Sequence, residues 1–377
     1  MKNAEIKIST HAIGPDSPVF MIAEMSGNHN RDLARAHAII DAAADAGADA
    51  LKLQTYTADT ITLNSDRPEF TLTWQGKTRT LYDLYQEGTT PWEWHAELFA
   101  HARERGMVPF SSPFDTTAVD FLEELHTQLY KVASFEVVDI PLLEAIGKTG
   151  KPVIMSRGMS TFEELELAVA TLRESGTTDI VILQCVSAYP AKPEDMNLLT
   201  IPYLAERFGV MAGLSDHTLT NDSAIAAVAL GARVIEKHMT DARAEGGVDS
   251  AFSLEPAEFA ALVRSVRTVE AALGKPTDAR AVREEGETRF RKSLFAAADI
   301  KRGEVLTEKN VRSVRPSTGL PPKYYRQVLG KRAARDISFA TPLTWALIEG
   351  GQPAALDSRD PAKQDVVSEE EFHAIQH

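Results

Sequence analysis

Two apolar runs, each typical of a β-strand, end in polar clusters that contain a histidine: Val210-Met211-Ala212-Gly213-Leu214-Ser215-Asp216-His217 and Arg233-Val234-Ile235-Glu236-Lys237-His238. If the two runs are neighbouring parallel strands of a barrel, both imidazoles point into the same mouth. Two imidazoles at one barrel mouth are the arrangement that a catalytic metal ion needs. The sequence on either side of these runs supports such a barrel.

Short apolar runs alternate with amphipathic stretches from Val19 to about Gly274. Eight runs are candidate strands: Phe20–Ala23, Ala50–Leu53, Met107–Phe110, Leu129–Val132, Pro152–Met155, Ile180–Leu183, Val210–Gly213 and Arg233–Glu236. Helical patterns lie between them, over 32–46, 92–105, 161–175 and 256–273. Eight strand-helix units over roughly 250 residues predict an α/β fold of the TIM (β/α)8 barrel type. A doubly wound sheet would give the same alternation and is the alternative.

A second, smaller module follows the barrel. We expect a barrel domain over 1–275, a charged linker over 276–292, a module of short strands and turns over 293–349 and a disordered tail over 350–377. A module of roughly 60 residues buries little apolar surface and is marginal alone. We therefore expect it to lean on another surface.

The connection between Gln54 and Met107 is too long for a simple strand-to-helix turn. It is rich in aromatic residues and only partly fits a helical pattern. Long connections after barrel strands usually form lids or substrate walls. The alternative is a surface excursion that is packed by its own aromatic side chains.

The composition excludes several classes of protein. The formal net charge of -14 argues against a surface for nucleic acids or anionic membranes. A single cysteine, Cys185, allows no intrachain disulfide. The first twenty residues lack a signal-peptide pattern, and no apolar run approaches the ~20 residues of a membrane span. We expect a cytoplasmic protein.

Oxygen-binding groups follow nearly every predicted strand, where barrel enzymes place their catalytic residues. These strand-end residues are Glu24, Asn28, His29, Lys52, Gln54, Ser111, Ser112, Lys131, Ser134, Glu136, Ser156, Ser187, Tyr189, Ser215, Asp216, His217, Lys237 and His238. Each serine alone is more often structural than functional. Buried lysines, however, need a counter-charge that a phosphate or carboxylate ligand would supply. The joint position of lysines and serines predicts a cradle for an anion.

His217 and His238 are the predicted metal ligands, although a single strand-end histidine is more often structural. Two neutral imidazoles leave coordination positions open for water and substrate. This suits a labile ion such as Mn²⁺, acting as a Lewis acid, better than a closed structural zinc site. Asp216 and Glu236 either orient the two rings or form a salt bridge in the barrel. His29 is a weaker third candidate, because its loop could instead cap a helix through Asn30.

Seven motifs together resemble one protein family. They are Ile22-Ala23-Glu24 with Asn28-His29-Asn30, Lys52-Leu53-Gln54, Ser112-Pro113-Phe114, Tyr130-Lys131-Val132-Ala133-Ser134, Gly213-Leu214-Ser215-Asp216-His217, Glu236-Lys237-His238 and Arg315-Pro316. From about Phe20 to Ile348 the chain closely resembles the sialic acid synthase family, which condenses phosphoenolpyruvate with an amino sugar to form nonulosonic acids. The resemblance implies that the barrel is followed by a C-terminal antifreeze-like SAF domain over 293–349.

The resemblance also implies roles for individual residues. His217 and His238 would bind the divalent metal, for which Mn²⁺ is expected and Mg²⁺ or Co²⁺ are alternatives. The phosphate and carboxylate of phosphoenolpyruvate would be held by Lys52, Ser112, Lys131, Ser134, Ser156, Ser187 and Ser215. The sugar would face Glu24, Gln54, Tyr189 and Asp249. Glu136 would sit beside the forming tetrahedral centre, and Glu136 or Glu24 would accept a proton from the attacking water. In a homodimer, Arg315 of the SAF domain would complete the partner's site.

Within the family, Leu81–Glu87, Thr90–Trp94 and Asp249–Pro256 resemble the pseudaminic acid synthase branch, which implies 2,4-diacetamido-2,4,6-trideoxy-L-altrose as the sugar. N-acetylneuraminate synthase and legionaminate synthase are the alternatives, and a class II metal-dependent aldolase is a more distant one. A non-catalytic carbohydrate-binding or ice-binding protein is disfavoured because the module has no threonine-rich repeat. Two positions depart from the family pattern: Ser187 replaces an asparagine common in the sialic acid branch, and Arg157 replaces a threonine.

Overall fold

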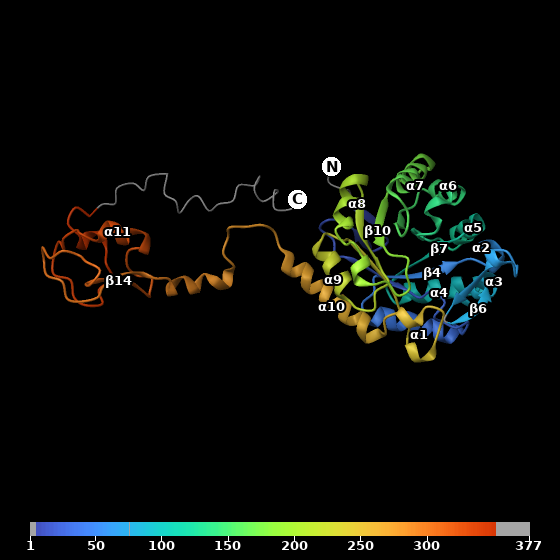
Figure 1. Cartoon of the computed structure of the whole chain (residues 1–377), viewed down its shortest axis with the longest axis horizontal. Helices are drawn as coiled ribbons and strands as arrows, with labels where there is room; N and C mark the ends of the chain where they lie inside the picture. The colour runs from blue at the N-terminus through green and yellow to red at the C-terminus, as the bar shows by residue number, and fades with distance from the viewer. Residues whose placement is uncertain (1–4, 75, 352–377) are drawn as a thin grey trace. The chain divides into compact units, whose positions relative to one another are not determined.

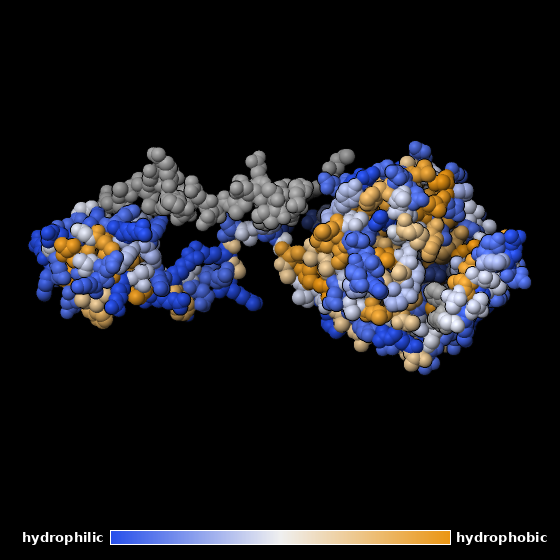
Figure 2. Space-filling model, in the orientation of Figure 1, coloured by the Kyte–Doolittle hydropathy of each residue, from blue (hydrophilic) through white to orange (hydrophobic). Residues whose placement is uncertain are grey.

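The computed structural model describes residues 5–74 and 76–351. The chain divides into two compact units, Met1–Lys275 and Pro276–His377 (Figure 1). Among the described residues, no helix is both long and apolar enough to cross a lipid bilayer. The predicted tail lies outside the described residues from 352 onward. The visible face of the first unit is a mosaic of hydrophilic and hydrophobic residues (Figure 2).

Eight parallel strands of the first unit form a closed barrel. Each strand pairs with the next barrel strand along the chain, and the last pairs with the first. The strands are β3 (Phe20–Glu24), β4 (Ala50–Thr55), β7 (Val108–Pro113), β8 (Tyr130–Val132), β9 (Val153–Ser156), β10 (Ile180–Cys185), β11 (Met211–Asp216) and β12 (Val234–His238). All eight predicted runs form these strands, so the TIM-barrel prediction is confirmed and the doubly wound alternative is wrong.

Helices follow the strands and cover the outside of the barrel (Figure 1). They are α1 (Leu33–Asp45), α4 (Trp92–Glu104), α5 (Thr116–Glu124), α6 (Ile140–Lys148), α7 (Phe162–Ser175), α8 (Thr200–Phe208), α9 (Asp222–Ala229) and α10 (Pro256–Leu273). The cap of α1 is Asp32, whose carboxylate accepts the backbone N–H groups of Ala34 and Arg35. Asn30, which the sequence suggested as a cap, does not serve this helix.

Alternate residues of each strand face the interior and the helices, because strand side chains alternate with period two. Ile235 packs in the layer between sheet and helices, whereas Val234 packs inside the barrel. The hairpin of β1 (Ile6–Ile8) and β2 (His11–Ile13) adds apolar side chains to the interior cluster. The sequence pattern did not predict this hairpin.

The long connection after β4 holds α2 (Ala58–Ile61), α3 (Leu81–Gly88) and a hairpin of β5 (Thr71–Trp74) with β6 (Lys77–Thr80). Tyr56 anchors it, because its carbonyl accepts the Thr89 hydroxyl at 2.7 Å and the Trp92 indole N–H at 3.1 Å. The end of the connection is therefore held against the residue that follows β4.

The second unit is built from short strands, turns and isolated bridges. β13 (Ser293–Ala296) pairs antiparallel with β14 (Val311–Val314), and α11 (Tyr325–Val328) follows. The small apolar core includes Leu294, Ile300 and Leu343. Two 3-10 helices, Val282–Glu284 and Gly286–Phe290, occupy the segment that was predicted as a linker.

Candidate active site

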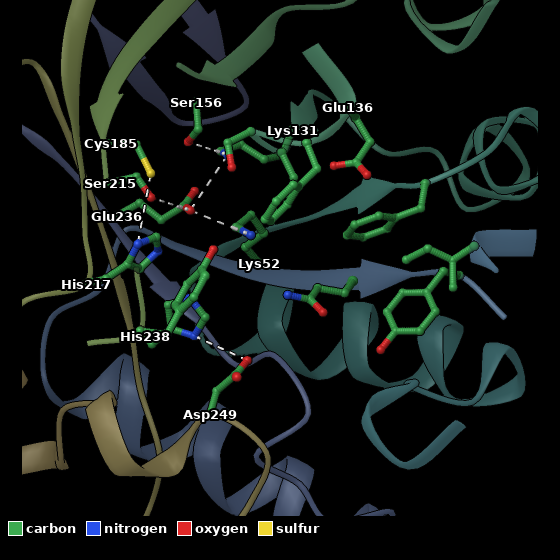
Figure 3. Close-up of a pocket in the computed structure, with 18 of the residues that line it drawn as sticks. Lys52, Lys131, Glu136, Ser156, Cys185, Ser215, His217, Glu236, His238 and Asp249 are labelled. Atoms are coloured by element: carbon green, nitrogen blue, oxygen red, sulfur yellow. Dashed lines mark hydrogen bonds and ion pairs between the residues drawn. The ribbon is translucent and has the colours of Figure 1, made fainter. Parts of the chain in front are cut away.

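A pocket of about 350 Å³ is lined by residues from the carboxyl ends of the barrel strands and from the connection after β4 (Figure 3). Its lining residues are Lys52, Gln54, Tyr56, Ile61, Tyr85, Phe114, Lys131, Ala133, Ser134, Phe135, Glu136, Ser156, Cys185, Tyr189, Ser215, His217, Glu236, His238 and Asp249. Carboxyl strand ends are where TIM-barrel enzymes carry out their chemistry.

The alternation of strand side chains explains which polar groups enter this pocket. Val234 is directed into the barrel, and two-residue steps along β12 therefore bring Glu236 and His238 inward. Lys237, one residue out of phase, points to the opposite face. Gly213 allows β11 to lie close to β12, because a Cβ at this position would meet the Val234 carbonyl oxygen at 2.2 Å. The two histidine-bearing strand ends are thus held together.

Two lysines and two glutamates form a buried charge cluster, of which Lys52, Lys131 and Glu236 line the pocket floor (Figure 3) and Glu24 lies behind them. The Lys52 ammonium lies 2.7 Å from a carboxylate oxygen of Glu24 and 3.7 Å from one of Glu236. Lys131 lies 3.8 Å from the same Glu236 oxygen. One central carboxylate is therefore shared by two ammonium groups, which leaves Lys131 without a close anionic partner of its own.

Burial shapes the charge state of this cluster. Burial raises the pKa of Glu24 to about 7, against the opposing effect of Lys52. Burial also lowers the pKa of Lys131, because Glu236 compensates only in part. For Glu236, burial favours the neutral form, but Lys131 and Lys52 outweigh it and the pKa falls below its ordinary value. An arriving anion would supply the counter-charge that Lys131 lacks.

Small hydroxyl side chains complete an anion cradle around Lys131. The Lys131 ammonium donates to the Ser156 hydroxyl at 2.7 Å, and the Ser134 and Ser187 hydroxyls lie 2.8 Å apart. Gly158 keeps this region open, since its φ is +52° and an added Cβ would lie 2.2 Å from Cβ of Ser134. A larger residue at Gly158 would fill the cradle.

His217 and His238 lie edge to face, with ring centroids 5.3 Å apart and 65° between the ring planes. Nδ1 of His217 lies 2.8 Å from the Val186 carbonyl oxygen, to which it can only donate, so Nε2 keeps its lone pair when the ring is neutral. Burial lowers the pKa of His238 well below its ordinary value. Buried Nδ1 of His238 has no hydrogen-bond partner among the described residues, and it lies 3.8 Å from Asp249.

The two rings have the chemistry of metal ligands, because a neutral imidazole offers a nitrogen lone pair. Burial opposes protonation of His217, but Cys185 and the Val186 carbonyl outweigh burial and raise its pKa, so a metal ion would displace a proton from this ring. No third His, Cys, Asp or Glu in the described part of the chain joins them in a metal-holding group. The pair suits an ion whose remaining ligands are water and substrate rather than a closed structural site.

Asp216 and Lys237, each next to one of these histidines, form an ion pair on the outer face of the two strands. The Lys237 ammonium donates to Asp216 at 2.7 Å and to the carbonyls of Thr218 and Thr220, each at 2.8 Å. Both side chains are buried. The sequence left open whether Asp216 orients the imidazoles or forms a salt bridge in the barrel. The structure shows the salt bridge.

Eleven of the sequence-predicted site residues line the pocket together. They are Lys52, Gln54, Lys131, Ser134, Glu136, Ser156, Tyr189, Ser215, His217, His238 and Asp249. Glu24, Ser112 and Ser187 do not line it but contact residues that do. Arg315 belongs to the second unit, so its predicted contribution to a partner's site stays a prediction. His29 is buried elsewhere and bonds Thr90, as a structural histidine would.

Sequence reasoning missed several lining residues, chiefly Cys185 and a group of apolar side chains. Cys185 lies with its sulfur 4.0 Å from Nδ1 of His217, on the side of the ring away from Nε2. Cys185 is the last residue of β10, two residues before Ser187. Its position at the end of an apolar run could have identified it as a candidate site residue. The apolar residues come from the connections that follow the strands, including the short helices α2 and α3, where period-two patterns give no signal.

Comparisons with known proteins agree with this architecture. A family model described as the NeuB family matches residues 39–278, and a SAF domain model matches residues 291–349. The chain is 46% identical over 334 residues to pseudaminic acid synthase of Campylobacter jejuni, covering 87% of this chain and 96% of that protein. It is 44% identical to the pseudaminic acid synthase of Helicobacter pylori, with 87% and 97% covered.

A solved structure of similar fold is the N-acetylneuraminic acid (sialic acid) synthetase of Leptospira borgpetersenii in complex with citrate. It is 32% identical, with a TM-score of 0.68, and the match covers 76% of this chain and 95% of that one. Barrel topology, strand-end chemistry and both domain matches lead to one conclusion. The chain belongs to the NeuB family and carries a C-terminal SAF domain.

Proposed function

We propose that this protein is a pseudaminic acid synthase, which condenses phosphoenolpyruvate with 2,4-diacetamido-2,4,6-trideoxy-L-altrose and releases phosphate. The observation that carries this proposal is the graded similarity to characterised relatives. Identity is 44–46% with pseudaminic acid synthases but 35% with the N,N'-diacetyllegionaminic acid synthase of Campylobacter jejuni. It is also 35% with human N-acetylneuraminate-9-phosphate synthase. The site adds a chemical reason, since its floor has buried cations suited to a phosphorylated acid.

In this reaction Lys131 and the serine cradle hold the anionic groups of phosphoenolpyruvate. Lys52, fixed by Glu24 and Glu236, adds a second cation on the floor. Gln54, Tyr189 and Asp249, which also line the pocket, would contact the sugar. These residues hold C3 of phosphoenolpyruvate toward the aldehyde carbon of the open-chain sugar, so that binding energy is converted into orientation.

His217 and His238 would hold a divalent cation, with Mn²⁺ as the preferred ion and Mg²⁺ or Co²⁺ as alternatives. When bound, such an ion supplies Lewis acidity toward the aldehyde oxygen of the sugar. Glu136 lies across the pocket from the histidines (Figure 3). Its carboxylate accepts the proton of the water that adds to C2, and phosphate then leaves with cleavage of the C–O bond.

The direct test is phosphate release from phosphoenolpyruvate with a panel of 2-acetamido and 2,4-diacetamido hexoses, with and without chelator. We expect release with the 2,4-diacetamido-2,4,6-trideoxy-L-altro sugar to exceed release with N-acetylmannosamine and with the legionaminate precursor. We also expect chelation to stop the reaction and Mn²⁺ to restore it. A class II aldolase would release no phosphate, and preference for another sugar would assign the chain to another branch.

Glu136 gives a prediction for pH dependence. Burial raises the pKa of Glu136 to about 7, against the opposing effect of Lys131. The proton-accepting carboxylate forms above this pH, so kcat/KM should fall as the pH drops through about 7. Glu136→Gln should lower kcat/KM by roughly 10²- to 10⁴-fold and remove this limb of the profile. If the limb persists in Glu136→Gln, another group titrates, and Glu24 is the alternative because its pKa is also raised to about 7.

We also propose a homodimer in which Arg315 of the SAF domain of one subunit completes the pocket of the other. Co-folded mixtures of His217→Ala and Arg315→Ala subunits test this arrangement. Each single variant should be nearly inactive. A mixed dimer should contain one intact site, so random mixing should restore about a quarter of the wild-type activity. No recovery in verified mixed dimers would contradict action across the dimer.

We expect the reaction to take place in the cytoplasm.

A further inference from the structure

One wall of the pocket is apolar. It consists of Ile61 at the end of α2, Tyr85 in α3, Phe114 after β7 and Phe135 after β8. We call these four residues the apolar wall. Tyr56 holds part of the wall in place, because its ring makes edge contacts with Phe114 at 5.2 Å and with Tyr85 at 5.9 Å between centroids.

The barrel topology places Phe114 and Phe135 of this wall opposite the two histidines. The circular strand order is β10, β11, β12, β3, β4, β7, β8 and β9. β7 and β8, which precede Phe114 and Phe135, are thus each four positions from β11 and β12 respectively, which is half of the eight-stranded circle. Glu136, the neighbour of Phe135, indeed lies across the pocket from His217 and His238 (Figure 3).

This placement determines which end of the sugar meets the wall. In the proposed reaction, the aldehyde carbon lies beside the histidines and phosphoenolpyruvate. The other end of the open chain, carbon 6, therefore extends toward the opposite side. Apolar surface there favours a methyl group, whereas a hydroxyl pressed against it loses hydrogen bonds to water. Polar groups in the rest of the pocket remain available to the acetamido groups.

We propose that the apolar wall is the specificity-determining subsite for carbon 6 of the sugar and selects hexoses that are deoxygenated at this carbon. This inference rests on the proposed synthase function and goes beyond it, because it names the residues that discriminate a 6-methyl from a 6-hydroxymethyl end. It also gives the long connection after β4 a function, since Ile61 and Tyr85 belong to that connection.

The test compares two sugars that differ only at carbon 6: 2,4-diacetamido-2,4,6-trideoxy-L-altrose and 2,4-diacetamido-2,4-dideoxy-L-altrose. Phosphate release from phosphoenolpyruvate gives kcat/KM for each. We expect the wild type to prefer the deoxy sugar by roughly 10- to 100-fold, the range in which an apolar pocket discriminates such groups. Ile61→Asn, which adds a hydrogen-bonding group to the wall, should reduce this ratio by about 10-fold.

Leu63→Asn is the matched control, because Leu63 lies two residues away, is 66% exposed and does not line the pocket. Its ratio should equal that of the wild type. Phe135→Asn is a second test variant, at a side chain that is 58% exposed and so tolerant of replacement. Its ratio should also fall.

Equal kcat/KM for the two sugars in the wild type would overturn the inference while leaving the synthase function intact. The same conclusion would follow if Ile61→Asn, Phe135→Asn and Leu63→Asn all kept the wild-type ratio. Absence of phosphate release with every sugar of the panel would instead overturn the proposed function, and this inference with it.

Discussion

Replacement of His217 by alanine is expected to lower kcat/KM for phosphate release by roughly 10³-fold or more. The reason is that His217 and His238 are the predicted metal ligands, and both line the pocket with ring centroids 5.3 Å apart. Removal of one imidazole leaves a single ring, which cannot hold a labile divalent ion at physiological concentrations. The fold should persist, because the lost ring contacts the pocket rather than the barrel core. Steady-state phosphate release and the melting temperature measure the two effects.

His37→Ala is a suitable control for this experiment. His37 lies on α1, outside the pocket, and pairs with Glu97 at 2.8 Å. This variant should keep wild-type kcat/KM. Mn²⁺ binding, followed by the loss of the free-ion electron paramagnetic resonance signal, should be unchanged in His37→Ala and strongly weakened in His217→Ala. Retained metal-dependent activity in purified His217→Ala would contradict the assigned ligand set.

Lys237→Met is expected to destabilise the barrel unit by about 3–5 kcal/mol, the usual cost of leaving one partner of a buried ion pair uncompensated. The Lys237 ammonium makes three hydrogen bonds, to Asp216 and to the Thr218 and Thr220 carbonyls. Methionine fills the space but satisfies none of these acceptors. Denaturant unfolding, with the midpoint and slope fitted separately, measures the loss.

Adding Asp216→Asn to Lys237→Met should recover part of this stability. Asparagine removes the buried charge but can still accept the Thr218 backbone N–H through its side-chain carbonyl, as Asp216 does at 2.9 Å. The double variant should therefore be more stable than Lys237→Met alone. If the single variant unfolds at the wild-type midpoint, the pair does not stabilise these strand ends.

The strands could be predicted because each combines a short apolar run with polar residues at or just after its end. Their positions at strand ends led to the prediction that Lys52 and Lys131 lie at the mouth, and both line the pocket because they share the parity of residues inside the barrel. Pattern alone could not show that one carboxylate, Glu236, would be shared by these lysines. That arrangement depends on the circular order of the strands in the barrel. The alternation of side chains along a single strand does not determine this order.

The apolar wall could not be predicted from the sequence, for a different reason. Ile61, Tyr85 and Phe135 lie in the connections that follow barrel strands, and the alternation of side chains along a strand does not predict which residue of a connection faces a cavity. The N-terminal hairpin was missed because Ile6, Ile8 and Ile13 form runs too short to stand out, although they complete the interior core. Glu24 was expected to face the sugar, but its side chain is fully buried, does not line the pocket and pairs with the Lys52 ammonium at 2.7 Å.

The measurement that tests the central claim most directly follows the bridging oxygen of phosphoenolpyruvate. The enzyme is incubated with Mn²⁺, the 2,4-diacetamido-2,4,6-trideoxy-L-altro sugar and phosphoenolpyruvate labelled with ¹⁸O at the C–O–P bridge. If water adds at C2 and the C–O bond breaks, the released phosphate carries the label and the nonulosonic acid product does not. Label that remains in the organic product, or a sugar that is consumed without phosphate release, would contradict the account.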